Sequence, residues 1–188
     1  MSTIVESIRA EYLRYKTLAE GAIDQLEDAD LSREGPNGGN SIAVICWHVA
    51  GNLKSRFSDF LASDGEKPWR QREEEFRARM VSRAELLGKW EDGWKVLLDT
   101  LSTLSDSDLT KTATIRQQPL LVHEALHRSL SHASYHVGQI VYVAKGFRGK
   151  DWRYLSIPPG QSDSYNKAPQ YESATAQQAA LASRIARK

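Results

Sequence analysis

Cysteine and long apolar runs are scarce in this chain of 188 residues, whose single cysteine is Cys46. A lone cysteine cannot form a disulfide within the chain, so the sequence fits a reducing compartment. No apolar run approaches the ~18 residues that a membrane-spanning helix needs. The first residues, MSTIVESIRAEYLRYK, are charged throughout and lack the apolar block of a secretory signal. We therefore expect a cytoplasmic protein with no membrane partner.

An excess of charge of either sign is also missing. The chain has 25 Lys and Arg residues against 24 Asp and Glu residues, a formal net charge of +1. A protein that binds the phosphate backbone of a nucleic acid needs a concentrated basic surface, so we expect no nucleic-acid partner. Hydrophobic residues make up 40% and charged residues 26% of the chain, which is typical of a globular protein with one ordinary core.

Apolar residues recur at helical spacing in four segments. Their approximate bounds are Thr3–Leu26, Ile42–Ala62, Ser82–Leu104 and Pro119–Gly146. The third segment opens with Ser82 and Glu85, a capping-box pattern, and the fourth opens with a proline, which is favoured in a first helical turn. Strand signal is limited to a short stretch at 110–116. The sequence therefore predicts an all-α protein, an antiparallel four-helix bundle.

The chain changes character after Gly146, where turn formers and aromatic residues become frequent. From residue 167 it is rich in alanine and glutamine and has no apolar periodicity. We predict a bundle domain at residues 1–166 with a mostly irregular C-terminal extension. We predict a tail at residues 167–188 that is mobile or weakly helical.

Four of the five histidines lie in the fourth predicted helix and form two pairs at i,i+4 spacing. At ~100° per residue, His132 and His136 lie on a flank of small and apolar residues beside the apolar stripe of this helix. His123 and His127 lie on the opposite flank, which leads to a charged face. Spacing alone does not choose between the pairs, but the angular position favours His132 and His136 as residues of a buried site.

The second predicted helix offers a third imidazole. His48 lies at the edge of its apolar stripe, and Asn52 and Arg56 follow on the same row at i+4 and i+8. Three neutral imidazoles on two facing helices suit a divalent transition metal such as zinc or nickel. Three protein ligands leave a coordination position open, as in catalytic rather than structural zinc sites. Gln139, close to His136 on the fourth helix, could orient a ligand from behind.

Simpler explanations exist for several of these residues. A histidine pair at i,i+4 spacing also occurs by chance, and Gln139 also fits an ordinary surface position of a helix. Arg56 lies almost within the apolar stripe, where it could hold an anionic substrate group or pair with a carboxylate of a neighbouring helix. Trp47 lies opposite that stripe, where it either packs in a dimer interface or is a single exposed aromatic residue.

Several stretches of the sequence resemble a known family. HASYHVGQI, at residues 132–140, resembles the H-x-x-x-H-x-G-Q-[IL] signature in the fourth helix of the DinB-like (DinB/YfiT-like) superfamily of metalloenzymes. NSIAVICWHVAGNLKSRFSDFL, at residues 40–61, is similar to the second helix of that superfamily. SDGEKPWR and WRYLSIPPGQSDSYN look like one uncharacterised bacterial subfamily within it. The resemblance covers about residues 1–166.

This resemblance implies a bundle of up-down-down-up order, with a long crossover between the second and third helices, and often a homodimer. Carried over residue by residue, it implies that His48, His132 and His136 are ligands of a divalent metal, commonly zinc or nickel. Characterised members of the superfamily include transferases and isomerases that use low-molecular-weight thiols. The family pattern gives no role to His123 and His127.

The leading hypothesis is a metal-dependent enzyme, a transferase or hydrolase, that acts on a small molecule and activates a thiol or water at the metal. No residue of the sequence stands out as a general base. The alternative is a non-catalytic helical binding or assembly module in which the metal is structural or vestigial. A fourth protein ligand that closes the site would favour this alternative, whereas an open position beside polar residues would favour the enzyme.

Overall fold

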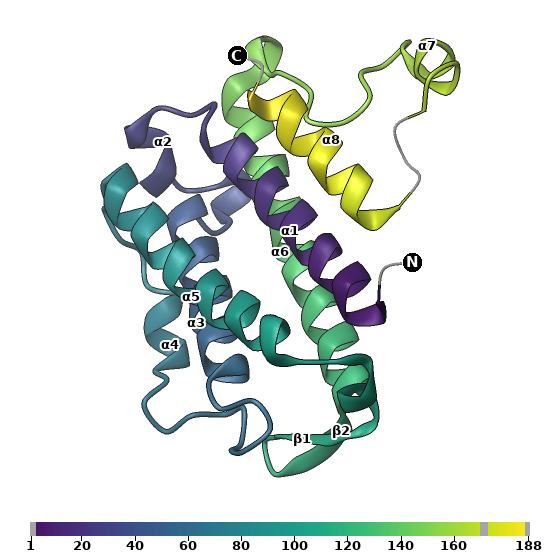
Figure 1. Ribbon diagram of the computed structural model, residues 1–188. Helices are drawn as coiled ribbons and strands as arrows, with labels where there is room; N and C mark the ends of the chain where they lie inside the picture. The colour runs from purple at the N-terminus through teal and green to yellow at the C-terminus, as the bar shows by residue number, and fades with distance from the viewer. Residues whose placement is uncertain (1–2, 170–172, 187–188) are drawn as a thin grey trace.

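Four long helices dominate the computed structural model, which describes residues 3–169 and 173–186 (Figure 1). The long helices are α1 (Ile4–Ile23), α3 (Ile42–Phe57), α5 (Arg83–Thr103) and α6 (Val122–Arg148). The shorter helices are α2 (Asp28–Ser32), α4 (Arg72–Glu75), α7 (Ser162–Asn166) and α8 (Ala174–Ala186), with 3-10 turns at Pro36–Gly38, Asp106–Thr110 and Gly149–Asp151. The prediction of a mostly helical protein is confirmed. The up-down-down-up order stays a prediction.

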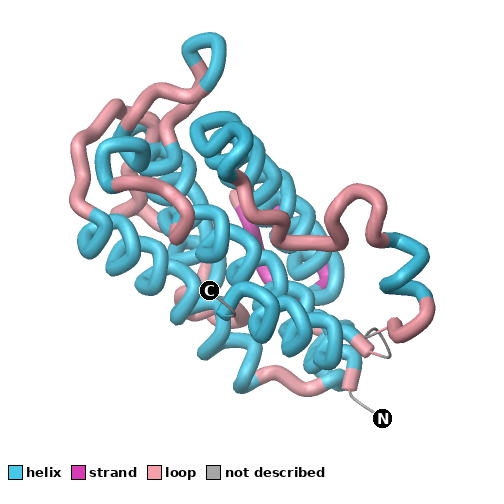
Figure 2. Tube along the Cα trace, turned by 90° about the horizontal axis from the view of Figure 1, so that it is seen from above, coloured by secondary structure: helices cyan, strands magenta, loops and turns pink. Residues whose placement is uncertain are grey.

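The sheet is a hairpin of two antiparallel strands, β1 (Thr112–Ile115) and β2 (Gln118–Leu121). Figure 2 shows these short strands in magenta against the cyan helices. The sequence predicts the first extended piece but not its partner. Within the described residues, no helix has the length and hydropathy needed to span a membrane.

Hydroxyl caps set the starts of three long helices. The side-chain oxygens of Thr3, Ser41 and Ser82 accept hydrogen bonds, at 3.1 to 3.2 Å, from backbone N–H groups in the first turn of the helix that follows. Such a cap satisfies an N–H group that has no partner within the helix, and it stabilises a helix by about 1 kcal/mol. These caps agree with the predicted starts of the first three helices.

Helix α3 packs against both α5 and α6, and α1 packs against α6. The side chains of Trp90 and Trp94 in α5 are fully buried in the shared core. Between them, Gly93 allows α5 to approach α3 closely, because a Cβ atom at Gly93 would lie 2.5 Å from the Cα atom of Ala50. Since α3 also carries His48, this contact helps to fix the position of that histidine.

Two predicted helix boundaries are wrong. Helix α3 ends at Phe57 rather than near Ala62, because the next residue, Ser58, has an extended ψ of 124° and Asp59 then has a left-handed φ of 48°. Helix α6 begins at Val122 rather than near Pro119, which lies in β2 instead. Proline has no N–H group to donate, and a two-stranded sheet tolerates it because each strand has an unpaired edge.

The C-terminal extension is partly helical. Helix α8 packs along α1 (Figure 1) and buries Leu181. Alanine and glutamine have high helix propensity, and the packed face supplies stability that a short isolated helix lacks. The expectation of a mostly irregular extension is therefore wrong for residues 174–186. The domain boundary at residue 166 stays a prediction.

We expect Gly93→Ala to lower the free energy of unfolding by about 1–3 kcal/mol, because the new methyl group overpacks the contact between α5 and α3. Gly88→Ala is a matched control in the same helix, since a Cβ atom there would meet nothing within 4 Å. This control should be neutral or stabilising by up to about 1 kcal/mol. Urea denaturation measures both. Equal free energies of unfolding in the two variants would show that the contact between α5 and α3 has room for a methyl group at position 93.

Candidate metal centre

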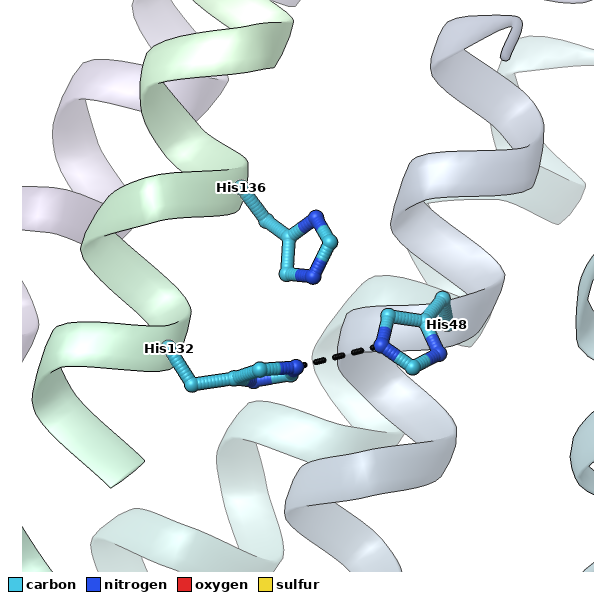
Figure 3. A group of neighbouring side chains, drawn as sticks. All are labelled: His48, His132 and His136. Carbon is cyan, nitrogen blue, oxygen red and sulfur yellow. Dashed lines mark hydrogen bonds between the residues drawn. The ribbon is translucent and has the colours of Figure 1, made fainter. Parts of the chain in front are cut away.

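Three histidines from two helices come together in the structure. His48 projects from α3, and His132 and His136 project toward it from successive turns of α6 (Figure 3). One ring nitrogen of each residue lies within 4.8 Å of the others. The Nε2 atoms of His48 and His132 are 3.1 Å apart. The histidine pair that the angular argument favours is therefore the pair that meets His48.

A divalent metal ion fits this donor set. At zinc–nitrogen distances of about 2.0–2.1 Å, two nitrogens of a tetrahedral site lie about 3.3 Å apart, close to the His48–His132 separation. Among the described residues, the group has no fourth His, Cys, Asp or Glu ligand. The three-histidine group could therefore hold a metal ion and would leave part of its coordination sphere to other molecules.

The orientation of His48 depends on a buried chain of charged groups. Its Nδ1 donates to Glu75 Oε2 at 2.9 Å, and the Arg70 guanidinium donates to both Glu75 oxygens at 2.8 and 2.9 Å. Burial disfavours the ionised form of Glu75, but the hydrogen bonds from His48 and Arg70 outweigh burial and hold its pKa below the ordinary value. Gly51 of α3 has no side chain and so leaves room for Glu75 beside the helix.

His136 is held from within its own helix. Its Nδ1 lies 2.7 Å from the side-chain oxygen of Gln139, where the sequence interpretation places an orienting group. A carboxylate and an amide oxygen only accept hydrogen bonds, so Nδ1 carries the proton in both His48 and His136. Their Nε2 lone pairs are then free to face the shared centre. Acceptors behind metal-ligating histidines commonly fix the tautomer in this way.

The two histidines of α6 that meet His48 resist protonation. Burial, followed by the charges of the neighbouring His136 and His48, lowers the pKa of His132 to about 3. Burial also lowers the pKa of His136, although the hydrogen bond to Gln139 opposes the shift. Both rings are therefore neutral at pH 7, the state in which imidazole binds a metal. Nδ1 of His132 is buried without a hydrogen-bond partner in the described part of the chain.

Two members of the three-histidine group face a cavity of about 190 Å³, and His136 does not line it. His48 and His132 form part of its wall, and Asn52 and Arg56 continue the wall along α3. Arg56 also pairs with Glu66 at 3.1 Å. Arg56 thus lines the cavity and pairs with a carboxylate that comes from the loop after α3 rather than from a neighbouring helix. Its role in holding an anionic substrate group stays a prediction.

Comparison with known proteins identifies a family without assigning a function. A model of the family described as Protein of unknown function (DUF1572) matches residues 2–161. The chain belongs to this family. No curated protein and no solved structure matches the chain. The chemistry of this DUF1572 protein therefore has to be argued from the site itself.

The other candidates lie away from the three-histidine group. His123 donates from Nδ1 to a backbone carbonyl oxygen, and His127 is exposed. Cys46 is fully buried in the core. The ring of Trp47 is partly covered by the Arg79 guanidinium of the same chain, whose central carbon is 4.8 Å from the ring centroid. The homodimer stays a prediction.

Glu75 and Arg70 are the site residues that sequence reasoning missed. Glu75 follows His48 by 27 positions, in the segment between α3 and α5, and no helical spacing connects the two. It ends the charged run RQREEE, which is typical of a solvated surface. A general rule does apply: the ring nitrogen of a histidine that does not bind the metal usually donates a hydrogen bond to an acceptor. The rule does not say which residue of the sequence supplies that acceptor.

We expect metal binding by this DUF1572 protein to require the three-histidine group. His132→Ala or His136→Ala removes one donor of three and should reduce bound zinc or nickel from about one ion per chain to near zero. His127→Ala changes an exposed histidine of the same helix and should keep the wild-type metal content. The measurement is the metal content per chain, by elemental analysis after each variant has been loaded with zinc or nickel and dialysed. Circular dichroism verifies that the variants are folded. If His127→Ala loses the metal while His136→Ala keeps it, the assignment is wrong.

Glu75→Gln should weaken metal affinity by about 10–100-fold, because it removes the ionised acceptor that orients His48. Glu74→Gln is the neighbouring control, since the Glu74 side chain is 46% exposed and pairs with Arg77 on the surface. Competition with a chromophoric chelator measures both affinities. Identical affinities in the two variants would mean that the carboxylate behind His48 has no effect on the metal.

Proposed function

We propose that this DUF1572 protein is a metal-dependent enzyme that acts on a small molecule, with zinc or nickel held by His48, His132 and His136. The observation that carries the proposal is that two of the three donors, His48 and His132, line a cavity and that the group has no fourth protein ligand among the described residues. Structural zinc sites are commonly closed by four protein ligands, whereas catalytic sites keep one position for water or substrate. The open group therefore favours an enzyme over a non-catalytic assembly module.

When bound, the metal supplies Lewis acidity and lowers the pKa of a water or thiol in the remaining position. The chain supplies orientation and environment. Glu75 and Gln139 hold two imidazoles with their lone pairs toward the centre. Phe57 and Phe60 line the cavity and exclude water from part of it. Since Glu75 is engaged by Arg70 and His48, we assign it to positioning rather than to proton abstraction.

The resemblance to the DinB-like superfamily supports a more specific proposal. We propose an up-down-down-up bundle that acts in the cytoplasm as a homodimer and transfers a low-molecular-weight thiol to an electrophile. In such a transfer the sulfur forms a bond to the electrophilic carbon, the leaving group departs with its electron pair, and the thiol proton passes to solvent. A thiol nucleophile ionises far more readily than water, which agrees with a cavity that no acidic side chain lines among the described residues.

A thiol-consumption assay tests the proposal. Full-length protein loaded with zinc or nickel is incubated with glutathione, bacillithiol or mycothiol and an electrophilic acceptor, and free thiol is measured over time. We expect turnover with at least one thiol. It should fall to background after chelation and in His132→Ala, whereas His127→Ala should behave as wild type. Stoichiometric metal without thiol consumption, together with a large drop in thermal stability on chelation, would support the non-catalytic module.

A further inference from the structure

We infer that the cavity beside the three-histidine group binds the anionic end of a small organic acid or phosphate ester through Arg56, Arg116 and Arg128. As a statement about the substrate, this inference rests on the proposed function. As a statement about anion binding, it depends only on the charges and shape of the cavity.

Arginine is concentrated around this cavity from four parts of the chain. Arg56 comes from α3, Arg70 and Arg72 from the start of the α4 region, Arg116 from the hairpin turn and Arg128 from α6. No acidic residue lines the cavity among the residues described. The chain as a whole has a net charge of only +1, so the gathering of five guanidinium groups is a local feature of this hollow.

Nearby carboxylates neutralise only part of this charge. The ion pairs are Arg56 and Arg116 with Glu66, Arg70 with Glu75, and Arg72 with Glu73. The Arg128 side chain has no hydrogen bond or ion pair within the described residues. Five guanidinium groups therefore face three carboxylates, and two positive charges remain uncompensated. Burial, together with the charges of Arg70 and Arg116, lowers the pKa of Arg56 despite its pairing with Glu66, as expected where cations crowd.

The hairpin turn holds Arg116 in an unfavourable backbone conformation. Arg116 and Gln117 have φ angles of 55° and 61°, in the left-handed region that is unfavourable for residues with a side chain. Asp64 offsets this cost by accepting hydrogen bonds from both backbone N–H groups, at 2.8 and 2.6 Å. Two-residue hairpins of this geometry favour Asn-Gly or Asp-Gly. An arginine in this position points to a use for its guanidinium at the cavity.

Polar groups also lie between the arginines and the three-histidine group. Asn52 follows His48 by one turn of α3, and Ser129 lies in α6 between Arg128 and His132; both line the cavity. Ser129 is 8% exposed, so Asn52 is the more accessible of the two polar side chains.

The size and lining of the cavity restrict the ligand. A volume of about 190 Å³ is below the ~300–1,000 Å³ of pockets that hold drug-sized molecules. Phe57, Phe60 and Ile115 add an apolar surface. A matching ligand carries a carboxylate or phosphate for the guanidinium groups, a short apolar part, and a reactive group near the histidines. The planar fork of arginine suits either anion.

Isothermal titration with inorganic phosphate and with succinate tests the inference. Full-length protein is used as purified, with its metal content measured, and again after chelation, at constant ionic strength set with chloride. We expect saturable binding that Arg128→Gln weakens by about tenfold or more, because a charge-assisted hydrogen bond is lost. Arg9→Gln makes the same change of net charge at an exposed position of α1 that does not line the cavity, and it should keep the wild-type affinity.

Each outcome separates this inference from the metal proposal. Tighter binding of phosphate indicates a phosphate ester and tighter binding of succinate an organic acid, and either result supports the inference. Equal affinities in the wild type, Arg128→Gln and Arg116→Gln, or no saturable binding of either anion, would overturn it. Arg128-dependent binding in a protein that takes up no zinc or nickel on loading would keep the inference and overturn the metal enzyme. Metal-dependent turnover without Arg128-dependent binding would do the reverse.

Discussion

A buried ion pair between Arg70 and Glu75 ties the segment between α3 and α5 to the ring of His48. The two charged side chains are 2% and 9% exposed, and charges removed from water are tolerated only when each finds partners. Their positions therefore depend on one another and on the imidazole that completes the chain of hydrogen bonds. Phe76, which directly follows α4, packs its ring 4.6 Å from the His48 ring. The path of this segment, the tautomer of His48 and one wall of the cavity all follow from this pairing.

One end of the cavity holds the three-histidine group and the other holds the arginines, and both ends would carry positive charge once a metal is bound. Neutral imidazoles would bind a divalent metal without cancelling its charge, and the nearest carboxylate, Glu75, already pairs with Arg70. A bound metal would therefore add positive charge to a hollow in which arginine charge is already in excess. Such a field favours the ionised form of a bound thiol or water, and it favours an anionic group elsewhere on the same ligand. The proposed chemistry and the proposed ligand class thus have a common physical origin.

Local rules explain what could be predicted from the sequence. The fixed rotation per residue of a helix separates His132 and His136 from the solvated flank of His123 and His127, and the structure shows the same separation. The cap at Ser82 and the length of α5 follow from hydrogen bonding within one turn and from apolar periodicity. The missed features depend on partners that are distant in sequence. Glu75 meets His48 across 27 positions, and no local pattern announces such a pairing.

The hairpin turn, at the arginine end of the cavity, is a second feature that local sequence patterns do not predict. Its turn lacks the glycine that usually marks a left-handed backbone, and Asp64, 52 positions before Arg116, stabilises it instead. The pairing of His132 with His136 therefore follows helical spacing, whereas the position of Arg116 depends on long-range hydrogen bonds from the loop after α3. Because the two ends have separate origins, changes in that loop or in the hairpin turn can alter the ligand while the three-histidine group stays the same. Local sequence patterns point to Arg56 of the proposed anion site, but they do not reveal Arg116, whose backbone is held by a residue 52 positions away.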